Sequence, residues 1–506
     1  MNPLLALAFQ FVTIVNPIRI SVYNPDPVAS IRAQYAVINK LSLPATWLVT
    51  FDILDNPVMV SEIKNFNKSQ ETGLFLEISK NFAGASGVEY HETGSWHFAN
   101  AVLLSGYTQE ERIKLIDKIF EKYKSIFGSY PTSAGSWWTD SFSLNYMKEK
   151  YGITADLGCA DQQATDNYFL WGQYWSIPYY PSKFHTGIPA QSKDTKIGVV
   201  RFQWAARDPR GGYYSSLESI QDNPKIFKKL LDLYVQKHDN QFGQITVGLE
   251  GDLTPSVYDG VYAEQMNIVA KSGYEVTTMK QFAQWYQNQF PDISPEHKIS
   301  SDGATWYQNP KIRTGTIDGK IIDTRIYDDR FMEPYYVSPN RERTLFINIP
   351  DSAFSGSGTT YSAWSAETSH AFKSPRFLLG LLYGKGRDKI HRQTFFIPPD
   401  ELFALHKLSK LKKGKILVLN QECLQCEWHT KYPHPSSANQ RGYVSKYIGF
   451  PIIYISKIDK NIQKLGAKYL YLVKFEEYIE SLGNLSPGDI GAKKIYENAN
   501  AQIWRF

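Results

Sequence analysis

Three carboxylates lie where predicted β-strands give way to loops: Glu77, Asp140 and Glu250. Glu250 directly follows an apolar run, and the glycines beside it, Gly248 and Gly251, leave room for a ligand or another backbone to approach. Paired carboxyl groups suit cleavage of a glycosidic bond, because one protonates the leaving oxygen while the other attacks the anomeric carbon or activates water. We predict Glu250 as nucleophile or base, Asp140 as acid, and Glu77 as a third catalytic residue.

Such residues need a scaffold that brings strand ends together. Residues 9–290 alternate strand-like and helix-like patterns, which predicts parallel βαβ units and, with seven or eight strands, a barrel. The predicted strands are residues 9–15, 45–51, 73–79, 134–137, 154–157, 174–177, 197–203, 244–249 and 274–277. The predicted helices are residues 27–41, 109–127, 141–150, 224–235 and 261–271. Active sites of parallel barrels gather at the carboxyl ends of the strands, so we expect Asn16, Asp52, Glu77, Asp140 and Glu250 at one mouth.

Alternation along residues 73–79 puts Glu77 on the same face as Phe75, pointing into the barrel. A buried lone charge costs several kcal/mol, so this carboxylate needs a partner or a function. The structural alternative is that Glu77 and Glu250 pair with Arg201 or a lysine and only hold the barrel together.

Aromatic residues make up 14% of the chain, with 33 Tyr, 28 Phe and 12 Trp, which fits either a sugar-binding cleft or a large aromatic core. Several tryptophans fall near predicted strand ends, where a ring can stack on a pyranose: Trp137, Trp138, Trp171, Trp175 and Trp204. The loop at residues 90–106 follows the strand that bears Glu77 and is long enough to cover the mouth. We predict Trp96 and His97 in this loop as sugar contacts, together with Asn16 and Asp52 at strand ends.

The chain continues past the barrel with two further units. Residues 305–350 carry short consecutive strands and an Asp318-Gly319 hairpin signal, and residues 354–360 read as a linker. An α/β pattern resumes beyond residue 374, with strands at 416–419, 452–455, 469–473 and 502–504. The predicted fold class is α/β: a distorted (β/α) barrel at 1–295, a small β domain at 296–360 and a C-terminal α/β domain at 375–506.

Composition excludes several other classes of protein. A net charge of +5 over 506 residues is too diffuse for a nucleic-acid partner, and no apolar run reaches the length of a membrane span. The sequence shows no signal peptide in this numbering. Cys423, Cys426 and His429 offer three metal ligands where zinc needs a fourth, so we predict no zinc there.

Four stretches resemble the polysaccharide deacetylase (NodB homology) fold of the glycoside hydrolase/deacetylase superfamily. They are residues 43–49 (LPATWLV), 71–76 (ETGLFL), 128–153, which include GSYP, GSW and KEKYGI, and 271–278 (KSGYEVTT). The resemblance covers a little over half the chain and implies a barrel that acts on carbohydrate. Glycoside hydrolases on this superfamily's barrel work with paired carboxylates.

The departures from that family concern its metal site. The family has an Asp at the end of the first strand, where this chain has Asn16, and two histidines near the next motif, where this chain has Phe75, Glu77 and Ser79. The Arg of the third motif is missing, and Glu250 stands at or beside the last His. We predict no catalytic metal and no other cofactor, while weak Ca²⁺ or Mg²⁺ binding to oxygen ligands stays open.

The last residues, 466–473 and 494–505, are similar to soluble C-terminal domains of membrane glycosyltransferases that use lipid-linked sugars. Together these features predict a carbohydrate-active hydrolase that cleaves or deacetylates a cell-envelope or extracellular polysaccharide, with a polysaccharide or oligosaccharide as its partner. They also predict an extracytoplasmic or envelope-associated location. The alternative is a catalytically inactive sugar-binding or scaffold protein on the same barrel.

Overall fold

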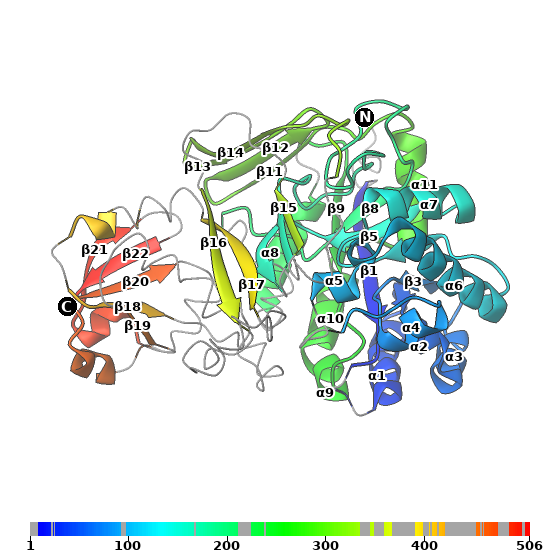
Figure 1. Cartoon of the computed structure of the whole chain (residues 1–506), viewed down its shortest axis with the longest axis horizontal. Helices are drawn as coiled ribbons and strands as arrows, with labels where there is room; N and C mark the ends of the chain where they lie inside the picture. Colours follow the sequence, from blue (N-terminus) through cyan, green and yellow to red (C-terminus); the bar gives the residue numbers. More distant parts are fainter. Residues whose placement is uncertain are drawn as a thin grey trace, which may run out of the picture.

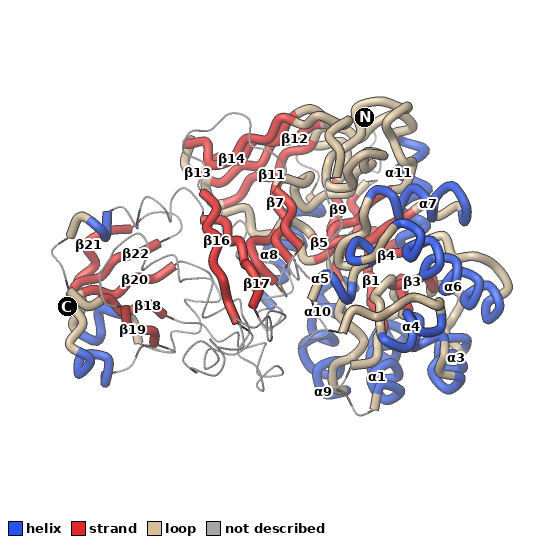
Figure 2. Tube along the Cα trace, in the orientation of Figure 1, coloured by secondary structure: helices blue, strands red, loops and turns tan. Residues whose placement is uncertain are grey.

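The computed structural model describes residues 9–21, 24, 26–92, 98–165, 168–210, 224–236 and 239–333, and shorter stretches between 345 and 506. Figures 1 and 2 show the elements of these residues.

The first half forms an eight-stranded, wholly parallel sheet with the order β10-β1-β2-β3-β4-β5-β8, in which β9 also pairs with β1. Its strands are β1 (Gln10–Ile18), β2 (Thr46–Val49), β3 (Glu71–Phe75), β4 (Ser133–Gly135), β5 (Ala155–Cys159), β8 (Val200–Trp204), β9 (Gly243–Val247) and β10 (Glu275–Thr277). β8 and β9 are in contact without a ladder between them, so the sheet curls round but does not close. This is the distorted (β/α) barrel that the sequence predicts.

Helices follow most of these strands, and in Figure 1 α1, α3 and α6 lie around the outside of the barrel strands. The helices are α1 (Pro27–Lys40), α2 (Phe51–Leu54), α3 (Pro57–Lys64), α4 (Lys80–Ala85), α5 (Ala99–Val102), α6 (Gln109–Phe127), α7 (Ser141–Tyr151), α8 (Pro224–Val235), α9 (Pro255–Val257), α10 (Ala263–Lys271) and α11 (Met279–Gln289). α6 has the predicted bounds because Thr108 and Glu111 form a capping box at its start. Among the described residues, no helix is both long and apolar enough to cross a membrane.

Three barrel segments differ most from the prediction. The predicted strand at 73–79 ends at Phe75 as β3, so Glu77 lies past the strand rather than on it. β1 continues through Pro17 to Ile18 instead of ending at Asn16, because Pro17 still pairs in register with β2, opposite Leu48. Residues 174–177 are not a strand, and the sheet takes β8 directly beside β5. The longer β1 matters for function, since it delivers Arg19 to the mouth of the barrel.

A four-stranded antiparallel sheet follows the barrel, with strands β11 (His297–Ser301), β12 (Ala304–Asn309), β13 (Ile312–Ile317) and β14 (Lys320–Ile326). The predicted hairpin at Asp318-Gly319 joins β13 to β14. Trp306 of β12 stacks on Trp175 with ring centroids 3.7 Å apart, and the buried Arg313 of β13 pairs with Asp161 beyond β5. These contacts fix the sheet firmly to the barrel.

The remaining strands form three small sheets. β15 (Leu345–Asn348), β7 (Tyr168–Trp171) and β6 (Gln162–Thr165) form one, and β16 (Thr359–Ala366) pairs with β17 (Ile390–Ile397). The last is a mixed sheet of β18 (Ile416–Leu419), β19 (Ile452–Ile455), β20 (Tyr469–Val473), β21 (Lys493–Glu497) and β22 (Ala501–Arg505). Short turns of 3-10 or π helix occur at Leu104–Gly106, Tyr258–Tyr262, Lys460–Leu465 and Pro487–Ile490.

The β16–β17 ladder joins residues on both sides of the predicted boundary at 360–375, and Thr359 and Thr360 of the predicted linker belong to β16. The domain limits therefore stay a prediction. Cys423, Cys426 and His429 lie outside the described residues.

The buried His297 predicts acid-sensitive folding. Within the described part of the chain neither of its ring nitrogens has a hydrogen-bond partner, and burial lowers its pKa to about 3. In the unfolded chain His297 binds a proton below about pH 6.5. The free energy of unfolding therefore has its full value above that pH and falls by about 1.4 kcal/mol per pH unit towards pH 3. Burial also lowers the pKa of His185 to about 3, so this residue adds a second loss of stability on acidification.

Between pH 6 and pH 4 we expect the free energy of unfolding of His297→Phe to fall less steeply than that of the wild type. The two slopes should differ by the contribution of one proton, about 1.4 kcal/mol per pH unit. Urea unfolding at a series of pH values measures this slope. Identical slopes for the two proteins would contradict the assignment.

Candidate active site

Arg19 lies one residue beyond β1, at the carboxyl ends of the barrel strands, and meets three carboxylates there. Its Nε donates to Asp252 Oδ2 at 2.9 Å, and its Nη1 lies 3.4 Å from Glu77 Oε2 and 3.8 Å from Glu250 Oε1. We call these four residues the Arg19 cluster. The predicted convergence of Glu77 and Glu250 at one mouth is therefore observed.

The loop that carries Glu250 and Asp252 is held along β1 by backbone contacts. Gly248 has φ 145°, and a Cβ there would lie 1.9 Å from Val15 O, so only glycine fits. Gly251 N donates to Pro17 O at 2.7 Å. The chain past β9 is thus pressed against the end of β1, and both carboxylates arrive beside Arg19.

Asn16 contributes to the same loop rather than to the open mouth. It is fully buried, and its Oδ1 accepts from Leu249 N at 3.2 Å and from Tyr262 Oη at 3.1 Å. These contacts anchor the residue before Glu250. They favour a positioning role over the substrate contact that we predicted.

Glu77 lies between β3 and α4 in a segment that is fixed on both sides. Leu76 N donates to Gly135 O of β4 at 2.8 Å, and Ile78 N donates to Val102 O at 2.9 Å. Ser79 then caps α4 through Phe82 N. Glu77 is thus presented by rigid backbone, with 14% of its side chain exposed against 22% for Glu250.

The charges of the Arg19 cluster act on one another. Burial alone would lower the pKa of Arg19, but Glu250, Glu77 and Asp252 outweigh it and hold this pKa well above its usual value. Arg19 is therefore always a cation. Three carboxylates within 4 Å of one guanidinium also repel each other, so the Arg19 cation is needed to hold them together.

Aromatic rings adjoin the cluster. The Arg19 guanidinium lies 6.0 Å from the Trp137 ring centroid, and Trp137 meets Phe75 edge-on at 4.8 Å and Trp204 at 6.5 Å. Phe75 and Trp204 end β3 and β8, and Trp137 follows β4, so the three rings share the mouth with the charged groups. Trp137 keeps its predicted place beside the candidate catalytic carboxylates.

Tyr90 also belongs to this environment. Its pKa rises to about 12, mainly through burial, with the carboxylates of Glu92 and Glu77 adding to the shift. The phenol therefore stays neutral at physiological pH, and the surroundings of Glu77 are poorly solvated on this side.

Asp140 lies in a different setting from the one predicted for an acid. It caps α7: Oδ1 accepts from Ser143 N and from Arg112 Nη1, both at 2.9 Å, and Oδ2 accepts from Ser143 Oγ. The residue is 2% exposed. The catalytic role of Asp140 stays an untested prediction, and these contacts favour a structural one.

For two of the predicted sugar contacts the structure favours a packing role, because their rings are wholly buried in the protein. Trp138 donates from Nε1 to Glu333 at 3.0 Å, and Trp175 stacks on Trp306 and donates to Tyr234 Oη at 3.1 Å. Neither ring has exposed surface on which a pyranose can stack. Both are packing residues between the barrel and the segments that follow it.

The other predicted site residues fall in varied places. Asp52 lies in the first turn of α2, where its Oδ1 accepts from Asn81 at 2.8 Å. Trp96 and His97, and the side chain of Trp171, lie outside what the structure describes. The sequence analysis missed Arg19 and Asp252. Two signals could have found them: Asp252 lies two residues after Glu250, and Arg19 follows Val15 and Pro17 at the two-residue spacing that puts side chains on one face of a strand.

The predicted structural partner, Arg201, is wrong. It is fully buried and pairs with Asp156 at 2.6 Å, away from Glu77 and Glu250. Burial raises the pKa of Asp156 to about 6 despite this pairing. The cation that Glu77 and Glu250 share is Arg19.

The residues at the mouth do not fit the metal ion that the family resemblance implies. Among the described residues, no three His, Cys, Asp or Glu side chains are arranged to hold a metal ion. The oxygens of Glu77, Glu250 and Asp252 face a guanidinium cation instead.

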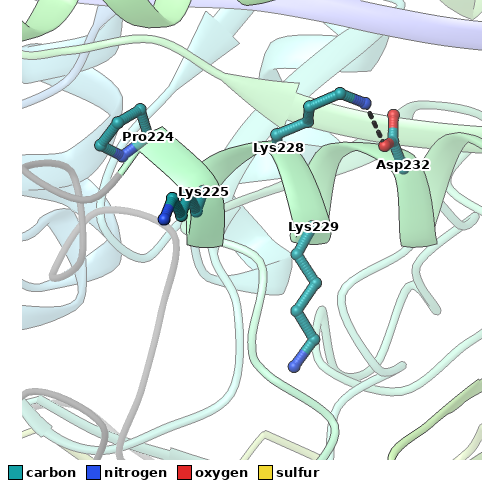
Figure 3. Close-up of a pocket in the computed structure, with 5 residues that line it drawn as sticks. All are labelled: Pro224, Lys225, Lys228, Lys229 and Asp232. Atoms are coloured by element: carbon teal, nitrogen blue, oxygen red, sulfur yellow. Dashed lines mark hydrogen bonds and ion pairs between the residues drawn. The ribbon is translucent and has the colours of Figure 1, made fainter.

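A separate shallow hollow lies on α8 and is lined by Pro224, Lys225, Lys228, Lys229 and Asp232 (Figure 3). Lys228 pairs with Asp232, and Lys229 pairs with Asp302 at 2.5 Å. The hollow shares no residue with the Arg19 cluster, and two of its three lysines, Lys228 and Lys229, are engaged by acidic neighbours.

We expect Arg19→Gln to destabilise the protein by about 3–5 kcal/mol at pH 7, because it leaves three largely buried carboxylates without their cation. The deficit should shrink as the pH falls, since carboxylates that have lost a cation bind protons more tightly in the folded state than in the unfolded one. Denaturant unfolding at pH 5 and pH 7 measures both effects. A deficit that grows on acidification would contradict this electrostatic account.

No protein-family model and no curated protein matches the sequence. Solved structures do match. One assigned as a glycoside hydrolase/deacetylase from Parabacteroides distasonis superposes with a TM-score of 0.51 and 16% identity, over 68% of this chain and 92% of that one.

Two further structures show weaker likeness. A protein assigned as a polysaccharide deacetylase from Mycobacterium smegmatis has 12% identity and a TM-score of 0.37, over 58% of this chain and 95% of its own. A branching enzyme of glycoside hydrolase family 57 from Thermococcus kodakaraensis has 11% identity and a TM-score of 0.33, over 55% and 71%. The curled parallel sheet and the match to the Parabacteroides distasonis structure agree on the fold. The chain carries a divergent polysaccharide deacetylase-like (NodB homology) barrel of the glycoside hydrolase/deacetylase type.

Proposed function

We propose that the protein hydrolyses glycosidic bonds of a cell-envelope or extracellular polysaccharide, with Glu250 as nucleophile and Glu77 as acid. The observation that carries the proposal is that one nitrogen, Arg19 Nη1, lies 3.4 Å from an oxygen of Glu77 and 3.8 Å from an oxygen of Glu250. The sum of these two distances is the upper limit for the separation of the two oxygens. That limit admits the roughly 5–5.5 Å of retaining glycosidases and only the short end of the inverting range.

The roles follow from exposure and charge. Asp252 makes the shortest contact to Arg19 and is 5% exposed, which suits a structural counter-ion. Glu250 is the most exposed of the three carboxylates, and Arg19 favours its ionised form, as a nucleophile requires. Glu77 is less exposed than Glu250 and lies near the same Arg19 nitrogen, so we assign it the role of acid.

The reaction then runs in two steps. A Glu250 oxygen bonds to the anomeric carbon as the bond to the leaving oxygen breaks, and the proton of Glu77 passes to that oxygen. Glu77 next takes a proton from water, whose oxygen bonds to the anomeric carbon and releases Glu250. The net change is addition of one water across the glycosidic bond.

The competing function is a sugar-binding or scaffold protein in which the Arg19 cluster only holds the barrel. Incubation with acetylated and non-acetylated oligosaccharides separates the two. Shortened chains with new reducing ends support hydrolysis, released acetate would replace it with deacetylation, and binding without either product would establish the inactive alternative.

We expect Glu250→Gln to lower turnover by at least about two orders of magnitude, because the amide cannot act as nucleophile. Its stability should stay near that of the wild type, since Arg19 keeps Asp252 and Glu77 as partners. Turnover and thermal melting are measured on the same preparations. Glu92→Gln, which removes an exposed carboxylate paired with Lys80, is the control and should change neither quantity.

Unchanged turnover in Glu250→Gln would eliminate the catalytic role. A large fall in melting temperature would instead assign Glu250 to the structure.

We expect turnover to survive chelation, because the proposed chemistry uses carboxylates and no metal ion. Dialysis against EDTA, followed by elemental analysis and an activity assay, checks this. Loss of activity on dialysis, with recovery on adding Zn²⁺, would contradict the proposed mechanism.

A further inference from the structure

The indole N–H of Trp204 is a buried donor without a partner in the part of the chain that the structure describes. Trp204 ends β8 and is 2% exposed, and its Nε1 makes no hydrogen bond. Leaving a buried donor unpaired costs about 1–3 kcal/mol, so such groups in native proteins call for an explanation.

Four other buried tryptophans of the described chain, Trp47, Trp138, Trp175 and Trp306, behave differently, because their indole nitrogens donate. The acceptors are Gln70 for Trp47, Glu333 for Trp138, Tyr234 for Trp175 and the Pro209 carbonyl for Trp306, at 2.8–3.1 Å. Among these five rings, the indole nitrogen without a partner is that of Trp204, which ends β8 at the barrel mouth.

Acceptors without partners lie at the same end of the barrel. Asp252 Oδ1 is buried and unpaired, although Oδ2 of the same carboxylate bonds Arg19, and Thr50 Oγ1 is buried and unpaired just past β2. Trp204 itself contacts Trp137, the ring beside Arg19. Among the described residues, this end of the barrel thus holds two unpaired buried donors, Asn16 Nδ2 beside the loop before Glu250 and Trp204 Nε1 near Trp137, and two hydroxyl or carboxylate oxygens.

We propose that Trp204 Nε1–H is a substrate-binding donor, which bonds an oxygen of the sugar ring bound at the Arg19 cluster, and that Asp252 Oδ1 accepts a hydroxyl of the same sugar. A hydroxyl group both donates and accepts, so a neutral pyranose satisfies both atoms. The carboxylates of the cluster repel an anionic sugar. The substrate class is therefore neutral or N-acetylated glycans rather than uronates, an inference that rests on the proposed function.

The test measures binding rather than turnover, so that it can succeed even if hydrolysis is never found. Isothermal titration uses cellotetraose and the tetramer of N-acetylglucosamine as neutral probes and a galacturonate tetramer as the anionic one. We expect a neutral probe to bind more tightly than the galacturonate. Trp204→Phe keeps an aromatic ring but removes the donor, so it should lower the affinity for that neutral probe by about three- to tenfold.

Trp138→Phe is the matched control, because it makes the same change at a buried ring whose N–H already bonds Glu333. It should lose stability and leave probe affinity unchanged. Indole ¹H–¹⁵N spectra give a direct readout, with the Trp204 signal assigned by its loss in Trp204→Phe. That signal should move downfield on adding the neutral probe, while the Trp138 signal stays in place.

A Trp204 signal that does not move, equal affinity in Trp204→Phe, or preference for the galacturonate would each overturn the proposal. So would a failure of both neutral probes to bind. Weakened binding in Trp204→Phe without any product from the wild type would uphold this inference and refute the proposed hydrolysis.

Discussion

A buried guanidinium in need of counter-charges is the constraint on which the mouth of this barrel depends. Arg19 is 6% exposed and fully charged, so carboxylates must come to it. Glu77 comes from the end of β3, and Glu250 and Asp252 come from the loop after β9. One cation thereby ties the ends of three strands, β1, β3 and β9, into a fixed arrangement.

The same arrangement is suited to chemistry because the three carboxylates are not equivalent. The least exposed of them, Asp252, makes the closest contact to Arg19, while Glu250 has the most open side chain and the longest contact. A cluster of this kind can lose the reactive carboxylate without losing its counter-ion. Under the proposed function, stability and reactivity thus fall to different members of one ion-pair group.

Much of this fold could be predicted from the sequence, since hydrophobic periodicity and capping residues are local signals. α6 and α8 have the predicted bounds, and Glu77 and Glu250 meet at one mouth because both follow parallel strands. Arg19 was missed because Pro17 resembles a strand end, whereas its lack of an N–H is tolerated in β1. The tryptophans could not be told apart because only tertiary packing decides which ring is covered: Trp138 and Trp175 are, and Trp137 borders the charged cluster.

The most direct test is a crystal structure of the Glu250→Gln variant with a bound neutral oligosaccharide. We predict a sugar ring at the Arg19 cluster, with its anomeric carbon beside residue 250. A Glu77 oxygen should lie within hydrogen-bond distance of the glycosidic oxygen, and the Trp204 indole nitrogen should bond the sugar. A sugar bound elsewhere, with the cluster closed as it is here, would contradict this prediction.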